Sequence, residues 1–155
     1  MLQLPILSLF IRLIPETFLV MYAICLLTNS KVDLKKIFIS GVIGGIVIYI
    51  LRLLPIHFGV HTILAVMFYI LLSIKLNKIE MYKAIAGSLV SEITLFISDF
   101  ILVFVYTGIL KFPSEVLFGK TWIGTVAGIP SLILFYFIVR LIAYFKGKRA
   151  NYEQR

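Results

Sequence analysis

The chain has 155 residues, of which 61% are hydrophobic, with a mean hydropathy of +1.08 and a formal net charge of +8 at pH 7. A soluble domain of this length cannot bury so much apolar surface, whereas a lipid bilayer accommodates it. The length allows five membrane spans of about 20 residues and leaves no room for a soluble domain of about 50 residues, so no enzyme is expected.

The hydropathy pattern predicts an all-α, polytopic membrane protein built as one bundle of five transmembrane helices. The predicted spans cover residues 4–27, 37–54, 60–76, 84–106 and 122–145. They form a single domain over 1–146, followed by a short basic tail over 147–155. Pro55 ends the second span, because proline disfavours helix at the residue before it. Pro15 and Pro130 lie inside spans, where each removes a backbone hydrogen bond and is expected to kink its helix.

The Lys and Arg residues predict the orientation, since cytoplasmic loops carry an excess of both. The loop over 28–36, the segment over 75–83 and the C-terminal residues from Lys146 onward hold ten of these residues, against two on the other side. We therefore expect the N-terminus outside, the C-terminus in the cytoplasm and a multi-pass protein of the bacterial inner (plasma) membrane. The positive charge then reflects topology and contact with anionic lipid, with the bilayer and not nucleic acid as the partner.

Small residues at helical spacing mark surfaces where helices approach closely. Gly41 and Gly45 are four residues apart in the second span, and Gly124 and Gly128 repeat this spacing in the fifth. These Gly-containing faces indicate either packing inside one bundle or contact with a protein partner or a second copy of the chain. One sequence does not separate the two.

Ionisable residues inside the spans are the informative ones, because an unpaired charge at mid-span costs about 2.5–3.5 kcal/mol on insertion scales. The predicted topology gathers two acids and two bases in the outer half of the bundle, with two histidines beside them. We expect an arginine of this group to lie within salt-bridge reach of one of the acids, since a lone buried charge is costly. Glu92 is expected to stand apart, toward the cytoplasm. The six candidate ligand-binding residues are Arg12, Glu16, Arg52, His57, His61 and Asp99.

Three interpretations of this group remain open. It is a salt-bridged polar plug that fixes helix register, a ligand pocket open to the outside, or a relay for protons or ions. His57 and His61 are four residues apart, but two histidines without a third ligand do not predict a metal site. Cys25 is the only cysteine, so no intramolecular disulfide and no Cys-based metal site are expected. No catalytic set is visible, and no cofactor is expected.

Three segments of the chain resemble the N-terminal membrane-sensor region of sensor histidine kinases from Gram-positive, spore-forming bacteria. They are Ile14-Pro15-Glu16, the run from Arg52 to Thr62 that reads R-L-L-P-I-H-F-G-V-H-T, and Gly128-Ile129-Pro130. The residues that match these motifs include Glu16, Arg52, His57 and His61. In such kinases a dimerisation helix and an ATP-binding domain follow the last span, whereas this sequence stops at Arg155. The resemblance implies a signal-receiving membrane module without the kinase.

The leading hypothesis is a sensory or regulatory membrane module. It would recognise a small extracytoplasmic ligand through the outer group of charges and couple that ligand to a cytoplasmic partner. One alternative is the membrane subunit of a small-solute transporter, either the binding subunit of a vitamin importer or an ion carrier. A further alternative is a structural partner subunit.

Overall fold

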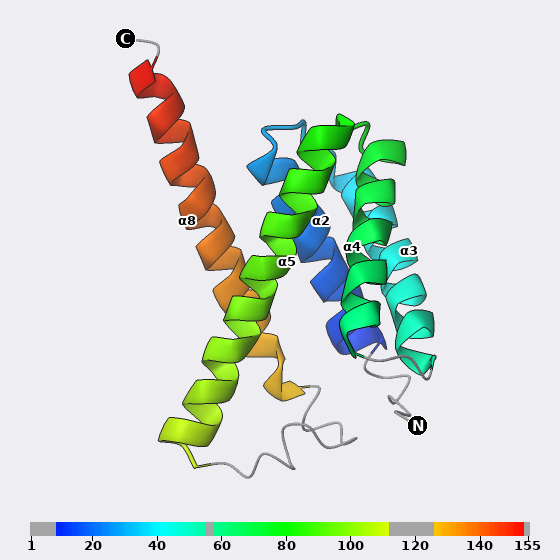
Figure 1. Cartoon of the computed structure of the whole chain (residues 1–155), viewed down its shortest axis with the longest axis vertical. Coiled ribbons are helices and arrows are strands. Elements are labelled where there is room, and N and C mark those ends of the chain that lie inside the picture. Colours follow the sequence, from blue (N-terminus) through cyan, green and yellow to red (C-terminus); the bar gives the residue numbers. More distant parts are fainter. Residues whose placement is uncertain (1–8, 55–57, 112–125, 154–155) are drawn as a thin grey trace.

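The computed structural model describes residues 9–54, 58–111 and 126–153, and this part of the chain is helical and contains no strand. The prediction of an all-α chain is therefore confirmed. In chain order the elements are η1 (Leu9–Leu13), α2 (Ile14–Leu27), α3 (Leu34–Leu53), α4 (Phe58–Lys75), α5 (Met81–Phe104), η2 (Val105–Ile109) and α8 (Ile129–Glu153) (Figure 1).

Four helical stretches are long and apolar enough to cross a membrane. They are Leu9–Leu27, Leu34–Leu53, Met81–Ile109 and Ile129–Gly147. The apolar part of α4, Gly59–Lys75, is a little shorter than these four. The chain therefore has the helices of a membrane protein, while the count of five spans and the orientation stay predictions.

Two helices begin where local backbone chemistry places them and not where hydropathy alone suggests. α3 begins three residues before the predicted span, because the Asp33 carboxylate accepts hydrogen bonds from the backbone N–H groups of Lys35 and Lys36 at 3.1 and 3.4 Å. α8 begins at Ile129, so Pro130 lies in its first turn, where the missing N–H costs no helical bond. Residues 126 and 127 are also helical, and Gly128 forms a turn between them and α8, so the helical path is interrupted next to Pro130. The kink at Pro130 stays a prediction. At its other end α8 continues to Glu153, through most of the predicted tail.

Pro15 marks an irregularity in the first helical stretch. It occupies the first turn of α2, and the turn before it, η1, is π-helical. A proline ring clashes with the carbonyl of the residue four positions earlier, and a π-helical turn relieves this by widening the helix. The adjustment falls next to Arg12 and Glu16, one on each side of the join between η1 and α2.

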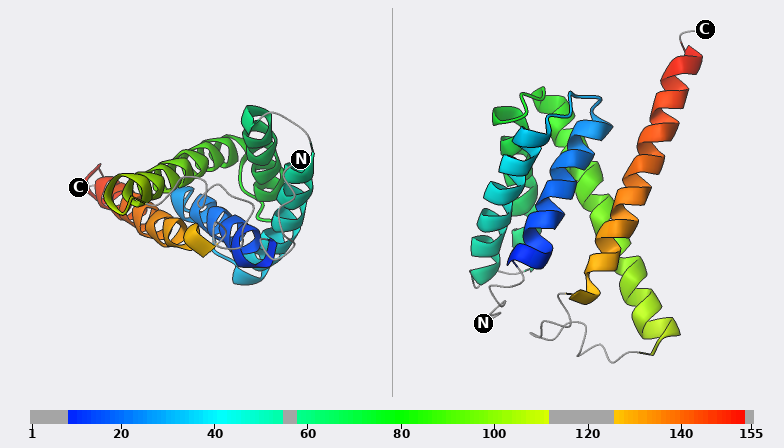
Figure 2. Two further views of the ribbon diagram at one scale, coloured as in Figure 1. Left: turned by 90° about the horizontal axis from the view of Figure 1, so that it is seen from below. Right: turned by 180° about the vertical axis from the view of Figure 1, so that it is seen from behind.

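α2 is the central helix, and it contacts α3, α4, α5 and α8. α3 and α4 lie on one side of it and α8 on another, with α5 crossing between α4 and α8 (Figures 1 and 2). Successive helices run in opposite directions, so one end of the bundle holds the end of α2 and the starts of α3 and α5. We call this the basic end. Its lysines with described side chains are Lys31, Lys35, Lys36, Lys75, Lys78, Lys83 and Lys146.

The bundle exposes large apolar side chains, and its apolar core also encloses polar side chains. Large hydrophobic side chains such as Phe38, Met67, Phe96 and Phe137 are more than half exposed. The buried polar side chains are Glu16, Thr17, Ser40, Ser73, Ser88, Ser91, Thr94, Ser98 and Ser131. Several of these hydroxyls donate to the carbonyl four residues earlier, as Ser73 does to Tyr69 at 2.7 Å. This distribution suits a helix bundle whose solvent is lipid.

Glycines let α3 lie directly against α2. A Cβ added at Gly41 would lie 3.2 Å from the Cα of Phe18, and one added at Gly45 would lie 3.1 Å from the Cα of Ile14. A Cβ at Gly44 would collide with Thr17. These glycines therefore pack within one chain, and contact with a partner or a second copy stays a prediction. Gly124 lies outside the described residues.

Candidate functional site

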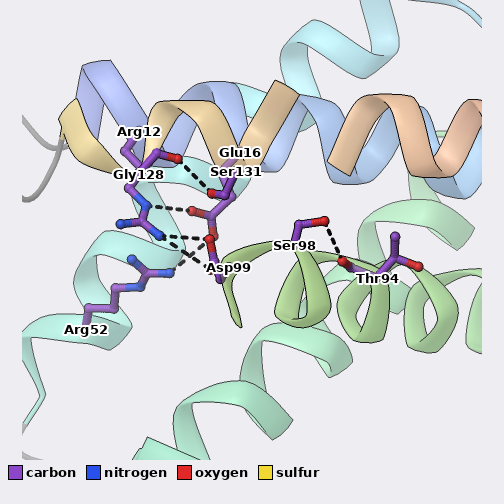
Figure 3. Close-up of polar contacts among 8 residues, drawn as sticks. All are labelled: Arg12, Glu16, Arg52, Thr94, Ser98, Asp99, Gly128 and Ser131. Carbon is purple, nitrogen blue, oxygen red and sulfur yellow. Dashed lines mark hydrogen bonds and ion pairs between the residues drawn. The ribbon is translucent and has the colours of Figure 1, made fainter. Parts of the chain in front are cut away.

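Four of the predicted site residues form one connected network, which we call the ion cluster: Arg12, Glu16, Arg52 and Asp99 (Figure 3). Glu16 joins both arginines, with Oε2 at 3.5 Å from Nε of Arg12 and Oε1 at 3.2 Å from Nη2 of Arg52. Nη2 of Arg12 also donates to both carboxylate oxygens of Asp99, at 3.4 and 3.5 Å. The predicted ion pairing is therefore confirmed.

Three separate parts of the chain supply the ion cluster. Arg12 ends η1 and lies one helical turn before Glu16 in α2, so the two share a helix face. Arg52 comes from the last turn of α3, which the glycine contacts hold against α2. Asp99 comes from α5. The ion cluster thus ties α2, α3 and α5 together at the end of the bundle opposite the basic end.

Burial differs sharply within the ion cluster. The side chain of Glu16 is only 6% exposed, while those of Arg52 and Asp99 are 35% and 38% exposed. Two acids balance two bases, so the network has no net formal charge. Nε of Arg12 is buried and approaches Glu16 without hydrogen-bond geometry. The cluster therefore has an enclosed centre at Glu16 and an accessible rim at Arg52 and Asp99.

Gly128 completes the surroundings of Arg12. A Cβ at Gly128 would lie 2.5 Å from Nη1 and 2.7 Å from Cζ of that arginine. Ser131 donates to the carbonyl of Gly128 at 2.7 Å and holds this turn at the start of α8 (Figure 3). The sequence indicated Gly128 as a helix-packing glycine and as part of the Gly128-Ile129-Pro130 segment, but nothing in the pattern says that an arginine lies opposite it.

Glu92 lies seven residues before Asp99 in α5, and among the described residues no ion pair joins it to the ion cluster. It lies within electrostatic range of Glu16, Arg52 and Asp99. Its Oε2 is buried and has no hydrogen-bond partner among the described residues. The placement of Glu92 toward the cytoplasm stays a prediction.

Tyr69 is the functional candidate that sequence reasoning missed. It is 2% exposed in α4, its hydroxyl interacts with the side chain of Thr17, and it lies within electrostatic range of Glu16, Glu92 and Arg52. An aromatic residue in an apolar run gives no signal of such a position. Helix α4 contributes no residue to the ion cluster. Tyr69 connects α4 to α2 through Thr17.

The two histidines are not part of the network that the structure describes. His57 lies outside the described residues. His61 lies in the first turn of α4, where its Nδ1 is buried without a hydrogen-bond partner. Among the described residues no contact joins His61 to the ion cluster, and no group of three His, Cys, Asp or Glu side chains is arranged to hold a metal ion.

The ion cluster offers hydrogen-bond donors and a carboxylate that a charged ligand could contact. Each guanidinium keeps N–H donors that the ion pairs do not use, and the carboxylate of Asp99 is accessible. Comparison with protein-family models, curated proteins and solved structures gave no match. The resemblance to the sensor region of histidine kinases therefore stays a prediction.

Proposed function

We propose that this chain is a sensory or regulatory membrane module that recognises a small charged ligand through the ion cluster and couples it to a cytoplasmic partner. One observation carries the proposal. The ion cluster joins three helices through pairs that share Glu16, and its rim at Arg52 and Asp99 is accessible. A polar plug that only fixed register would gain nothing from an open rim.

The shared pairs suggest how binding would be transmitted. A ligand carboxylate that engages Arg52 competes with Glu16 for that guanidinium, which loosens the link between α2 and α3. A ligand cation at Asp99 likewise competes with Arg12 and loosens the link to α5. A ligand shifts the arrangement only by its difference in affinity for the two states. The other end of α5 lies at the basic end of the bundle, where a partner on the cytoplasmic side would respond to a movement of this helix.

The proposal includes the finer topology of the chain. It takes α4 as a fifth span, places the N-terminus and the ion cluster outside, and places the basic end in the cytoplasm of a bacterial plasma membrane. The support is the ten-to-two distribution of Lys and Arg between the two sides.

The proposal is tested by following the distance between α3 and α5 in the full chain reconstituted into lipid nanodiscs. A fluorescent donor and acceptor are attached to cysteines introduced at Leu53 and Leu110, which are both exposed. The probe is the small-molecule fraction of spent medium from the source organism. We expect this fraction to change the energy transfer, and the change to disappear in Arg52→Leu.

The matched control is Lys35→Gln, which also removes one cation but lies at the other end of α3. It should respond as the unaltered chain does. A response that persists in Arg52→Leu and in Glu16→Gln, in protein with normal helicity, would show that the ion cluster does not bind the ligand.

Glu92 favours one second candidate, a carrier of protons or small cations. Its buried Oε2 has no partner among the described residues, and the same holds for the hydroxyls of Ser88 and Ser91 on α5. These side chains form a polar stripe that continues from Asp99 along α5. Proteoliposomes with a pH-sensitive dye inside discriminate the two functions. A carrier dissipates an imposed pH gradient and loses this activity in Glu92→Gln, whereas a sensory module leaves the gradient intact in both forms.

A further inference from the structure

A cleft of about 490 Å³ lies at the basic end of the bundle, far from the ion cluster. α2, α5 and α8 form it where α8 diverges from the other two helices (Figure 1). The residues that line it are Leu27, Thr28, Asn29, Tyr82, Lys83, Ala86, Gly87, Val90, Ile142 and Lys146. Its volume falls within the range of about 300–1,000 Å³ that is common for ligand pockets.

Two lysines place positive charge in this cleft. Nζ of Lys146 donates to the carbonyl of Leu27 at 2.6 Å, which holds the ammonium at the end of α2 instead of letting it extend away from the bundle. That contact uses one of its three N–H donors. Lys83 pairs with Glu80 at 2.9 Å, and both side chains are more than a third exposed, so the pair is weak and open to competition.

The rest of the cleft is apolar or aromatic. Ile142, Ala86 and Val90 form a wall along α8 and α5, and Val90 is 41% exposed, so the wall is reached from outside the bundle. Tyr82 lies at the mouth beside Lys83 and presents a ring and a hydroxyl there. The cleft therefore combines an apolar side, suited to an acyl chain, with a cationic mouth, suited to a phosphate.

We infer that this cleft binds the head group and upper acyl chain of an anionic phospholipid. Three features favour a lipid over a soluble anion or a protein segment. The helices α5 and α8 that line it expose large apolar side chains, its lysines lie at the basic end, and its wall of Ile142, Ala86 and Val90 is apolar. Basic pockets between membrane helices are the usual binding sites of anionic lipids. The inference is independent of the ion cluster and of the proposed sensory function.

The test is a titration of the purified full chain in detergent with phosphatidylglycerol and with phosphatidylcholine that has the same acyl chains, followed by native mass spectrometry. We expect one molecule of phosphatidylglycerol to bind more tightly than phosphatidylcholine. Lys83→Gln and Lys146→Gln should each weaken it about fivefold, the equivalent of about 1 kcal/mol per cation near the head groups. Glu80→Gln should tighten binding, because it releases Lys83 and removes a negative charge.

Two matched controls distinguish lipid binding in the cleft from nonspecific attraction of anionic lipid to a basic protein. The double variant Lys35→Gln/Lys36→Gln removes two cations from the same end of the bundle but outside the cleft, and should leave binding unchanged. Ala86→Phe fills the cleft without changing any charge and should weaken binding, whereas Leu89→Phe, on the same helix but outside the lining, should not.

Three results would overturn the inference. One is equal affinity for the two lipids. Another is that Lys35→Gln/Lys36→Gln lowers the affinity for phosphatidylglycerol as much as Lys83→Gln or Lys146→Gln does. The third is displacement of phosphatidylglycerol by inorganic phosphate at similar concentration, which would identify a site for small anions in place of a lipid site.

Discussion

Glu16 is the residue on which the ion cluster depends. It is the most buried member, and it is the only acid that contacts both arginines. Asp99 contacts Arg12 alone and is more exposed. In a site enclosed by apolar helices, an arginine that loses its acid cannot regain water at low cost. The energetic consequence of a substitution here therefore depends on which partners remain.

We expect Glu16→Gln to lower the free energy of unfolding by about 3 kcal/mol, because it leaves two arginines with only Asp99 as a partner. The double variant Glu16→Gln/Arg52→Leu should be more stable than Glu16→Gln, since it removes the arginine that has lost its acid. Chemical unfolding of the purified chain in detergent micelles measures both. A double variant less stable than the single one would contradict this account.

Gly128 makes room for the Arg12 guanidinium, so we expect Gly128→Ala to displace that side chain and weaken its pair with Asp99. The free energy of unfolding should fall by about 1 kcal/mol, because the group that must move is the end of a flexible side chain. The matched control is Gly147→Ala, in the same helix α8 but with no atom within 4 Å of the added Cβ. Thermal unfolding in detergent should show reduced stability for Gly128→Ala and no reduction for Gly147→Ala.

The interface between α2 and α3 is the element on which the ion cluster is built. Its glycines bring the two backbones close enough that the Arg52 side chain reaches Glu16 from the end of α3. The sequence predicted this glycine face but not its partner. The beginning of helix α2 is that partner, from Ile14 to Phe18.

We expect Gly45→Leu to separate α2 from α3, because even a Cβ at this position lies 3.1 Å from the Cα of Ile14. Overpacking of this kind costs about 1–3 kcal/mol. It should also make a subsequent Arg52→Leu change less damaging, since the pair with Glu16 is already weakened. Ile46→Leu, at the next position on the exposed face, is the control and should be neutral. Additive losses for Gly45→Leu and Arg52→Leu would show that the interface does not support the pair.

The charge distribution predicts the orientation of the whole molecule, and described residues at both ends allow a test of it. Cys25 is buried, and its replacement by Ala gives a cysteine-free background. We expect Lys111→Cys to react with an impermeant maleimide in intact cells, and Gly147→Cys to react only after the membrane is permeabilised. The reverse pattern would show that the basic end faces outside and that the orientation is wrong.

Hydropathy and charge alone predicted the all-helical chain, the approximate positions of its helices and the pairing of its buried ions. These properties follow from local composition and from the high cost of an unpaired charge in lipid. The observed helix boundaries differ from the predicted ones where a side chain caps a helix. Asp33 caps α3, which therefore begins earlier than hydropathy suggests. The π-helical turn before Pro15 likewise depends on backbone contacts that a hydropathy pattern does not contain.

Only the tertiary structure decided which residues meet across helices. It brought Gly128 against Arg12 and placed Tyr69 beside Thr17. It also opened the lysine-lined cleft between α5 and α8. The physical reason is that periodicity specifies which face of a helix is buried, whereas the crossing angles and the rotation of each helix against its neighbours arise from the packing of all the side chains together.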